Sequence, residues 1–512
     1  KDATMGPGWA HGFEQSITEG ERAISLREAE GRSVHFAKIK PGESTFHRRE
    51  RMTLSRDRDG SYRVFKLDGR LTCAFSASRA GGPALLRSMS DAWENAIELE
   101  HEGERLTRIV DTAGREVRVL WKESRIARLE VRADGQLAQW VDYTYSAAGC
   151  LETVADALGH TDEYEYDRWN RMIAATIKTG ARFQYEYQEN TGKCQKTWGP
   201  KGLYAIELRI DPAAKTTYVE GEEPRIISWN EQGEATRIAL PDGTVIEETA
   251  YDDDGFLVAR VNGAGEGTQY WYDARGNRIR TVDASGNVTA IEYDERDLPT
   301  KRTTADGLVT ELAHDDKGAL AGMRFPTGEL YSLSYDQRGH LTTVSSGGQV
   351  RKGLEYDASH DVIAEIDARG ARTAYSYDAL GRPVTREDPL GRVTRVAYDR
   401  LGRRIMARFP DGTTISRGYD ALGNLTREID TLGRVTSMEY AGMGVLAKLI
   451  EPDGRVWSFK HTSEERLAEI KNPRNETHTF TYDEAGQVAS EKGFDGRVLR
   501  YRYNPGGTLE RI

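Results

Sequence analysis

The sequence predicts an all-β protein: a long antiparallel β-ribbon of 21-residue repeats that has to coil. Three observations predict this fold. A tyrosine recurs with a 21-residue spacing, two glycines follow it at fixed distances, and the residues between the glycines alternate as they do in half-buried strands. A period of this length is typical of an array in which one supersecondary unit packs against the next.

The tyrosine spacing is the strongest of the three signals. From residue 251 to residue 503 a tyrosine returns at nearly every 21-residue step, and an aspartate usually follows it. His314 and His461 take the tyrosine position in two of the repeats. With 24 Tyr in 512 residues, chance does not produce this spacing. The predicted structural residues of the repeat are Tyr251, Asp252, Tyr272, Asp273, Gly276, Tyr293, Asp294, Tyr335, Asp336, Tyr356, Asp357, Tyr377, Asp378, Gly381, Tyr398, Asp399, Gly402, Tyr419, Asp420, Gly423, Tyr440, Tyr482, Asp483 and Tyr503.

Two glycines per repeat mark two turns. One lies four positions after the tyrosine, as Gly381 follows Tyr377, and the other lies fourteen positions after it, as Gly391 does. An aspartate opens such a turn by accepting hydrogen bonds from the backbone ahead of it, and glycine takes the position with positive φ that closes it. Two turns in each repeat leave two segments of about six residues, near the commonest strand length.

The segment that leads into each tyrosine reads as a strand. In residues 393–398, Thr394, Val396 and Tyr398 fall on one face. Such alternation of β-branched and aromatic residues indicates a half-buried strand. Each repeat is therefore predicted to be a hairpin-like pair of strands. We expect the tyrosines to stack on one another at one height of the sheet.

The repeat predicts three regions along the chain. Residues 1–140 lack the 21-residue spacing and are expected to form a leading β domain that caps the array. Residues 141–250 hold degenerate repeats, in which Leu208 and Trp229 continue the step and one extra residue resets it. Residues 251–512 hold the regular repeats. A twisted ribbon this long cannot stay flat, and coiling also leaves few exposed edges.

One segment of the leading region is ambiguous. Residues 84–100 fit a helix or a strand about equally well.

The composition of the chain disfavours several classes of fold, partner and binding site. Apolar residues are 38% and the mean hydropathy is -0.66, which suits a single-layer sheet with wet faces better than a large compact core. A net charge of -11 disfavours nucleic acid as a partner. The scattered Cys73, Cys150 and Cys194 predict neither a disulfide framework nor a zinc site, and we interpret them as small, at least half-buried residues. No apolar run is long enough to cross a bilayer, so no membrane span is expected, and no cofactor is expected either.

The motif in residues 272–277, Tyr-Asp-Ala-Arg-Gly-Asn, closely resembles the YD repeat of the Rhs family. Residues 388–394 and the opening Met-Gly-Pro-Gly-Trp of residues 5–9 are also similar to Rhs proteins of Gram-negative bacteria. The resemblance implies a ribbon that spirals into a hollow shell around a C-terminal toxin domain. The shells of Tc toxins and the extracellular teneurins share the repeat.

The resemblance also implies partners and a place in the cell. The toxin domain would lie inside the shell and would have an immunity protein. A secretion spike protein and a chaperone would act on the N-terminal region, often in type VI secretion. The protein would be made in the bacterial cytoplasm and then secreted or delivered into target cells. The family's self-cleaving aspartyl protease and toxin are expected beyond residue 512, so the chain is expected to be a processed or truncated piece.

Candidate chemical sites have plainer explanations. The aspartates after the tyrosines could bind calcium, but a turn also explains the glycine at a fixed offset. His314 and His461 replace one planar ring by another. Asp388-Pro389 resembles the family's cleavage motif, yet it occupies an ordinary turn position of its repeat.

The sequence thus predicts no catalytic and no metal-binding residue, and a non-catalytic shell as the function. Two alternatives remain open. One is an extracellular adhesion or carbohydrate-binding array. The other is an enzyme on a β-propeller, since two repeats together supply four strands and are the size of one blade.

Overall fold

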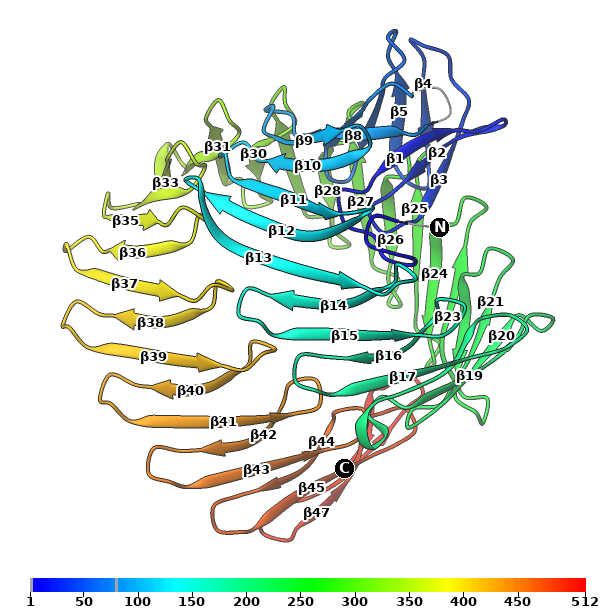
Figure 1. Cartoon of the computed structure of the whole chain (residues 1–512), viewed down its shortest axis with the longest axis vertical. Helices are drawn as coiled ribbons and strands as arrows, with labels where there is room; N and C mark the ends of the chain where they lie inside the picture. The colour runs from blue at the N-terminus through cyan, green and yellow to red at the C-terminus, as the bar shows by residue number, and fades with distance from the viewer. Residues whose placement is uncertain (1–2, 79–81) are drawn as a thin grey trace.

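The computed structural model describes residues 3–78 and 82–512 and confirms the all-β fold. Within these residues 47 strands form one sheet, and the last two strands pair separately. The one helical segment of the described chain is a 3₁₀ turn, η1 (Pro200–Gly202). Figure 1 shows the sheet as a ribbon of short strands that curls round and returns past its own beginning.

The leading strands vary in length and have no fixed spacing. They are β1 (Ser16–Glu19), β2 (Ala23–Arg27), β3 (Ser33–Ala37), β4 (Ser44–His47), β5 (Met52–Arg56), β6 (Tyr62–Lys66), β7 (Leu71–Phe75), β8 (Ala84–Ser90), β9 (Ala96–Glu102), β10 (Arg105–Val110), β11 (Glu116–Lys122), β12 (Arg125–Ala133) and β13 (Gln136–Tyr145). Strands β8 and β9 settle the ambiguous segment 84–100 as two strands.

The middle strands begin to take up the repeat. They are β14 (Leu151–Asp156), β15 (Thr161–Tyr166), β16 (Met172–Thr176), β17 (Arg182–Tyr187), β18 (Cys194–Trp198), β19 (Ile206–Asp211), β20 (Thr216–Glu220), β21 (Arg225–Trp229), β22 (Ala235–Ala239), β23 (Val245–Tyr251) and β24 (Leu257–Asn262).

The regular repeats supply the remaining strands, two for each repeat. They are β25 (Gly267–Tyr272), β26 (Arg278–Val282), β27 (Val288–Tyr293), β28 (Pro299–Thr303), β29 (Val309–His314), β30 (Leu320–Arg324), β31 (Leu330–Tyr335), β32 (Leu341–Ser346), β33 (Gln349–Tyr356), β34 (Val362–Asp367), β35 (Arg372–Tyr377), β36 (Pro383–Glu387), β37 (Val393–Tyr398), β38 (Arg404–Arg408), β39 (Thr414–Tyr419), β40 (Leu425–Ile429), β41 (Val435–Ala441), β42 (Val445–Ile450), β43 (Val456–His461), β44 (Leu467–Lys471), β45 (Thr477–Tyr482), β46 (Val488–Lys492), β47 (Val498–Arg500), β48 (Arg502–Tyr503) and β49 (Leu509–Arg511).

One position of the degenerate repeats departs from the predicted frame. Tyr187 and Trp229 each end a strand, as the later tyrosines do, but Leu208 lies in the middle of β19. The interpretation of Leu208 as a repeat position is therefore wrong. The loop between β18 and β19, which contains η1, displaces the strand that follows it.

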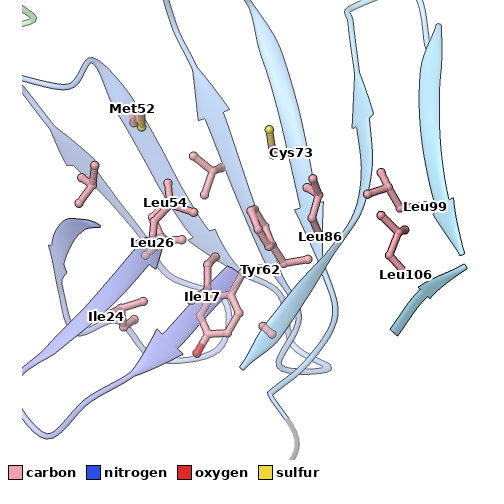
Figure 2. Packing of buried hydrophobic residues seen from close by; sticks show 14 of the residues in the cluster. Ile17, Ile24, Leu26, Met52, Leu54, Tyr62, Cys73, Leu86, Leu99 and Leu106 are labelled. Atoms are coloured by element: carbon pink, nitrogen blue, oxygen red, sulfur yellow. The ribbon is translucent and has the colours of Figure 1, made fainter. Parts of the chain in front are cut away.

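The leading strands fold back on one another and bury a core. Strand β1 pairs with both β2 and β8, so the first strand closes against the eighth. Ile17, Ile24, Leu54 and Tyr62 are fully buried there, and Figure 2 shows these side chains converging between the strands. The hydrophobic cluster runs from Met5 to Ile126.

The ribbon beyond the leading strands is a single layer. Consecutive strands pair antiparallel through short turns, as β35 does with β36 and β36 with β37. Exposure alternates along each strand, and the side chains of most positions are only half-buried. One continuous sheet also makes the β-propeller alternative wrong, because a propeller consists of separate four-stranded sheets.

The ribbon meets itself after one coil. The Asn95 side-chain amide donates to the Arg338 carbonyl, 243 residues further on. The Tyr204 hydroxyl donates to Glu465, 261 residues further on. In Figure 1 the turns that connect β31–β47 accordingly lie beside the strands β9–β19. The predicted coiling is thus confirmed. In these two contacts, one coil of the ribbon corresponds to 243 and 261 residues of the chain.

Candidate functional site

Each regular repeat has two turns, which we call the Tyr-Asp turn (after the tyrosine) and the second turn (after the next strand). In the Tyr-Asp turn that begins at Asp399, one carboxylate oxygen accepts the backbone N–H groups of Leu401 and Arg403, at 2.9 and 3.0 Å. The other oxygen accepts the Arg403 guanidinium at 2.6 Å. This is the predicted aspartate turn, and the same backbone pattern begins at Asp252, Asp273, Asp294, Asp336, Asp357, Asp378 and Asp420.

These contacts hold the aspartate in its charged form. Burial alone would raise the pKa of Asp399, but the hydrogen bonds from the Arg403 backbone and side chain leave that pKa below its ordinary value. Arg382, Arg403 and Arg434 pair in this way with Asp378, Asp399 and Asp430.

The tyrosine hydroxyls tie each repeat to the one before it. The Tyr398 hydroxyl donates to the Pro383 carbonyl oxygen, 15 residues back, at 2.8 Å. Successive repeats are therefore linked by a side-chain hydrogen bond as well as by the strand ladder. The same bond is made by Tyr272, Tyr293, Tyr335, Tyr356, Tyr377, Tyr419, Tyr440, Tyr482 and Tyr503.

The expected stacking of tyrosine on tyrosine is wrong. One strand lies between the strands that end in successive tyrosines, so the tyrosines are two strand spacings, about 9.6 Å, apart. The side chain that follows the turn glycine fills the gap. Phe256 lies 4.8 Å from the ring of Tyr272, and the Arg382 guanidinium lies 5.0 Å from the ring of Tyr398. Arg403, Arg466 and His340 take the same place beside Tyr419, Tyr482 and Tyr356, whereas other repeats have a smaller residue such as Asn277 or Ala319 at this position.

After one coil the ribbon passes its own beginning, and we call the part that follows the second coil. The Tyr-Asp turns of the second coil pack against the leading strands. Arg48 donates to the Asp273 carbonyl at 3.0 Å, and Arg51 donates to the Asn277 side-chain oxygen at 2.8 Å. Further along, the Trp93 ring lies 6.5 Å from the ring of Tyr335. We call this line of contacts between the two coils the seam.

The seam continues between two parts of the ribbon. The Tyr204 backbone N–H donates to the Ser463 carbonyl at 2.9 Å. The Arg225 guanidinium donates to the Glu484 carbonyl at 2.7 Å. A groove of about 670 Å³ lies on this stretch, between the loop at Leu203 and the turns at Leu422 and Val445.

The glycines show which edge of the ribbon is covered. A Cβ atom at Gly339 would lie 2.4 Å from the Trp93 ring, and one at Gly381 would lie 2.7 Å from Arg115. A Cβ atom at Gly412 or Gly433, in the second turns, would meet no atom within 4 Å. The second turns of residues 283–497 therefore form an open rim, on which Leu390 and Leu432 are 77% and 75% exposed.

The other candidate residues lie in ordinary places. Asp388 accepts the N–H groups of Leu390 and Arg392 in a second turn, as predicted for a plain turn. His314 and His461 end β29 and β43, where the other repeats have tyrosine.

The three cysteines are at least half-buried, as predicted. All three are free; Cys73 and Cys150 are buried and Cys194 is half-buried. Burial raises the pKa of the Cys73 and Cys150 thiols, which disfavours the reactive thiolate. In the part of the chain that the structure describes, no group of three or more His, Cys, Asp or Glu side chains could hold a metal ion. No helix there has the length and hydropathy to cross a membrane.

The sequence did not reveal the seam residues of the first coil. Arg51, Trp93, Asn95 and Tyr204 share no spacing, and their partners lie a whole coil away along the chain. One signal was present: the glycine of the Tyr-Asp turn is replaced at Asp297, His360 and Glu465, and each of these side chains contacts a residue of the seam.

Two models of known protein families match the repeat region of the chain. The family described as teneurin YD-shell matches residues 224–407, and the RHS repeat family matches residues 419–456. Both confirm the resemblance to YD-repeat proteins of the Rhs type. No curated protein matches the chain.

Solved structures share the fold. The crystal structure of TcdB2-TccC3 is 13% identical to the chain, with a TM-score of 0.50, and the match covers 83% of this chain and 32% of that one. The Tc holotoxin pore of Photorhabdus luminescens is 14% identical, with a TM-score of 0.40 and coverages of 97% and 29%. The first likeness shows a common β-shell fold, and the chain spans about a third of the length of that relative.

Proposed function

We propose that this YD-repeat chain is a wall segment of a protein container, which encloses a toxin domain of its own polypeptide until delivery. The chain acts by containment, and none of its residues does covalent chemistry. The seam is the observation that supports this proposal most strongly. A ribbon that only displayed binding sites would gain nothing from joining its edge to an earlier coil, whereas a wall needs that joint.

The finer parts of the proposal come from the family resemblance. The enclosed partner would be a toxin domain that follows the wall in the same gene. An immunity protein would protect the producer, and a secretion spike protein and a chaperone would act on the N-terminal region. Delivery by a type VI system in bacterial competition and delivery as a secreted Tc-like toxin are both compatible with a container of this kind.

Expression of the complete gene that contains this chain tests the proposal. Electron microscopy should show a hollow particle, and a C-terminal fragment should stay with it through gel filtration. That fragment should resist a protease that cleaves it once the particle has been denatured. A solid particle, or a fragment that separates freely, would contradict containment.

A pair of variants ties containment to the seam. Trp93→Asp removes the ring that covers Gly339 and Tyr335, so the enclosed fragment should become sensitive to protease. Trp271→Asp is the matched control, because the partly exposed Trp271 ring stacks with Arg280 of the next strand and not with another coil. Equal leakage in both variants would show that the seam is not what retains the fragment.

A further inference from the structure

Three Tyr-Asp turns of the regular repeats carry a side chain where the others have glycine: Asp297, His360 and Glu465. All three keep the left-handed backbone of that position, with φ of 63°, 69° and 58°. Residues other than glycine are uncommon in this conformation, although Asp and His adopt it more readily than most. Each of these three side chains makes contacts that a glycine could not make.

Asp297 makes two such contacts. Its carboxylate reaches back to the preceding Tyr-Asp turn, where it accepts the Arg275 guanidinium at 2.7 Å and the Asn277 amide at 2.8 Å. Both partners also touch the leading strands, because Arg275 lies 3.9 Å from the Phe46 ring and Asn277 accepts Arg51 at 2.8 Å. The Asp297 side chain thus fixes the turn that docks at the seam.

Glu465 does the same with other partners. Its carboxylate accepts the Met443 backbone N–H of the preceding Tyr-Asp turn and the Tyr204 hydroxyl of the first coil, at 2.5 and 2.7 Å. In both cases the side chain at the glycine position acts as a lock between a turn and the seam.

His360 occupies the same position, and its partners occupy the same positions as those of Asp297. His360 Nε2 lies 3.3 Å from the Arg338 guanidinium, and His360 Nδ1 lies 2.8 Å from His340 Nε2. His340 Nδ1 lies 2.9 Å from the Asp336 carboxylate. The Arg338 carbonyl accepts Asn95 of the leading strands.

This chain of contacts works only with two neutral imidazoles. An arginine can only donate, so His360 Nε2 must accept and His360 Nδ1 carries the hydrogen. That hydrogen is donated to His340 Nε2, and His340 Nδ1–H is left to donate to Asp336. A proton added at His360 Nε2 would face the Arg338 guanidinium, and one added at His340 Nε2 would face another N–H group.

We propose that Arg338, His360 and His340 form an acid-sensitive latch, which holds the turn of residues 336–340 against the leading strands and loosens when a histidine is protonated. The Asp297 lock has the same layout with a carboxylate in place of the imidazole. A carboxylate stays charged between pH 5 and pH 8, whereas an imidazole can take up a proton in that range.

The charged groups around His360 agree with this role. Burial lowers the pKa of His360, and His340, Arg338 and Arg115 lower it further, while Asp111 opposes them. On its own turn, burial and Asp357 raise the pKa of Asp361. Because the pKa of His360 is lower in the closed seam than the ordinary 6.5, the opened form binds more protons. The latch is thus at full strength above about pH 6.5 and weakens as the pH falls through the lower value of the closed form.

Hydrogen exchange of the whole chain tests the latch. Peptides that cover residues 91–95 and 336–361 should lose protection between pH 7.5 and pH 5.0, after correction for the intrinsic exchange rate, because the opened form takes up the proton that the closed form disfavours. Peptides that cover residues 273–297 should keep theirs, because the Asp297 lock stays charged throughout this range.

The matched variant is His360→Gly, which installs the residue that most Tyr-Asp turns have at this position and so should fold. It should remove most of the pH response at residues 91–95. His478→Gln is the control for loss of a histidine, because His478 pairs with Glu491 elsewhere in the ribbon. The proposal is overturned if the wild-type protein keeps its protection at pH 5.0, or if His360→Gly loses it as the wild type does. This test concerns the seam alone and does not depend on what the shell encloses.

Discussion

The leading strands and the regular ribbon are both antiparallel β-structure, but different forces hold them. In the leading strands Ile24, Leu26, Leu54 and Val64 are completely buried in a shared core. In the regular ribbon the large apolar side chains are mostly half-buried, and Leu298 is a rare buried one. There, most repeats make the same few local bonds: an aspartate turn, in several repeats an Asp-Arg or Asp-Asn contact, and a tyrosine hydroxyl bonded to a carbonyl 15 residues back.

The two regions therefore respond differently to the loss of one side chain. The leading region has a single shared core, so each core side chain contributes to the stability of the whole region. A ribbon is redundant, because nearest-neighbour bonds recur along it and the loss of one affects mainly its own repeat. The seam joins the two, and it lets the leading region set the path that the redundant region follows.

Leu54→Ala should have the largest effect, because it creates a cavity in the leading core. We expect the free energy of unfolding to fall by about 2–5 kcal/mol. Urea denaturation followed by tryptophan fluorescence measures it. Leu390→Ala is the control: with 77% of Leu390 exposed on the rim, this change should be close to neutral. Similar losses from both variants would show that the leading core does not dominate stability.

Gly339→Ala and Gly412→Ala compare the covered edge of the ribbon with the open rim. Both glycines have positive φ, +83° and +86°, so both variants should lose about 1–2 kcal/mol from the left-handed backbone. Only the alanine at 339 also meets Trp93, which should add about 1–3 kcal/mol and loosen the seam. Thermal unfolding measures the loss of stability from the backbone, and hydrogen exchange at residues 91–95 measures the loosening of the seam. Equal effects of the two variants would mean that the Trp93 ring moves aside without loss of stability.

The sequence predicted the ribbon well because its determinants are local. Aspartate, glycine and tyrosine recur at fixed offsets, and each bond they form lies within one repeat length, as the bond from Tyr398 to Pro383 does. The tyrosine column was only partly foreseen. The fixed spacing showed that the rings line up, but the residue that separates them, such as Phe256 or Arg382, varies in type.

The seam could not be predicted in the same way. Its contacts join residues such as Asn95 and Arg338 that lie 243 residues apart. Which turn meets which depends on how far the ribbon twists in each repeat, and small changes in twist accumulate over a whole coil. The Tyr-Asp turns that lack glycine, at Asp297, His360 and Glu465, were visible in the sequence as exceptions. Their contacts at the seam became apparent only in the coiled structure.

Asp399→Ala should have a smaller and local effect. It removes the acceptor for two backbone N–H groups and the partner of Arg403, which should cost about 1–2 kcal/mol in the stability of its repeat. Asp399→Asn keeps a side-chain oxygen and should restore part of the loss. The pKa of Asp399 is lowered from 3.8, so its charge-dependent stabilisation is present above about that pH and is lost as the pH falls through the folded value. Exchange of peptides over residues 399–403 measures each effect, and an asparagine variant as damaged as the alanine variant would assign the whole contribution to the charge.

Tyr398→Phe should have the smallest effect and tests redundancy most directly. It removes one hydrogen bond, from the hydroxyl to the Pro383 carbonyl, and keeps the ring against Arg382. A single hydrogen bond of this kind contributes about 0.5–1.5 kcal/mol. Exchange should therefore speed up within residues 378–404, while the leading strands and the repeat around Tyr272 stay unchanged. Tyr398→Ala also removes the ring and should affect the neighbouring repeat as well. If Tyr398→Phe instead weakens the leading strands, then the seam makes the ribbon and the core one cooperative unit, and the redundancy argued from the repeated bonds does not hold.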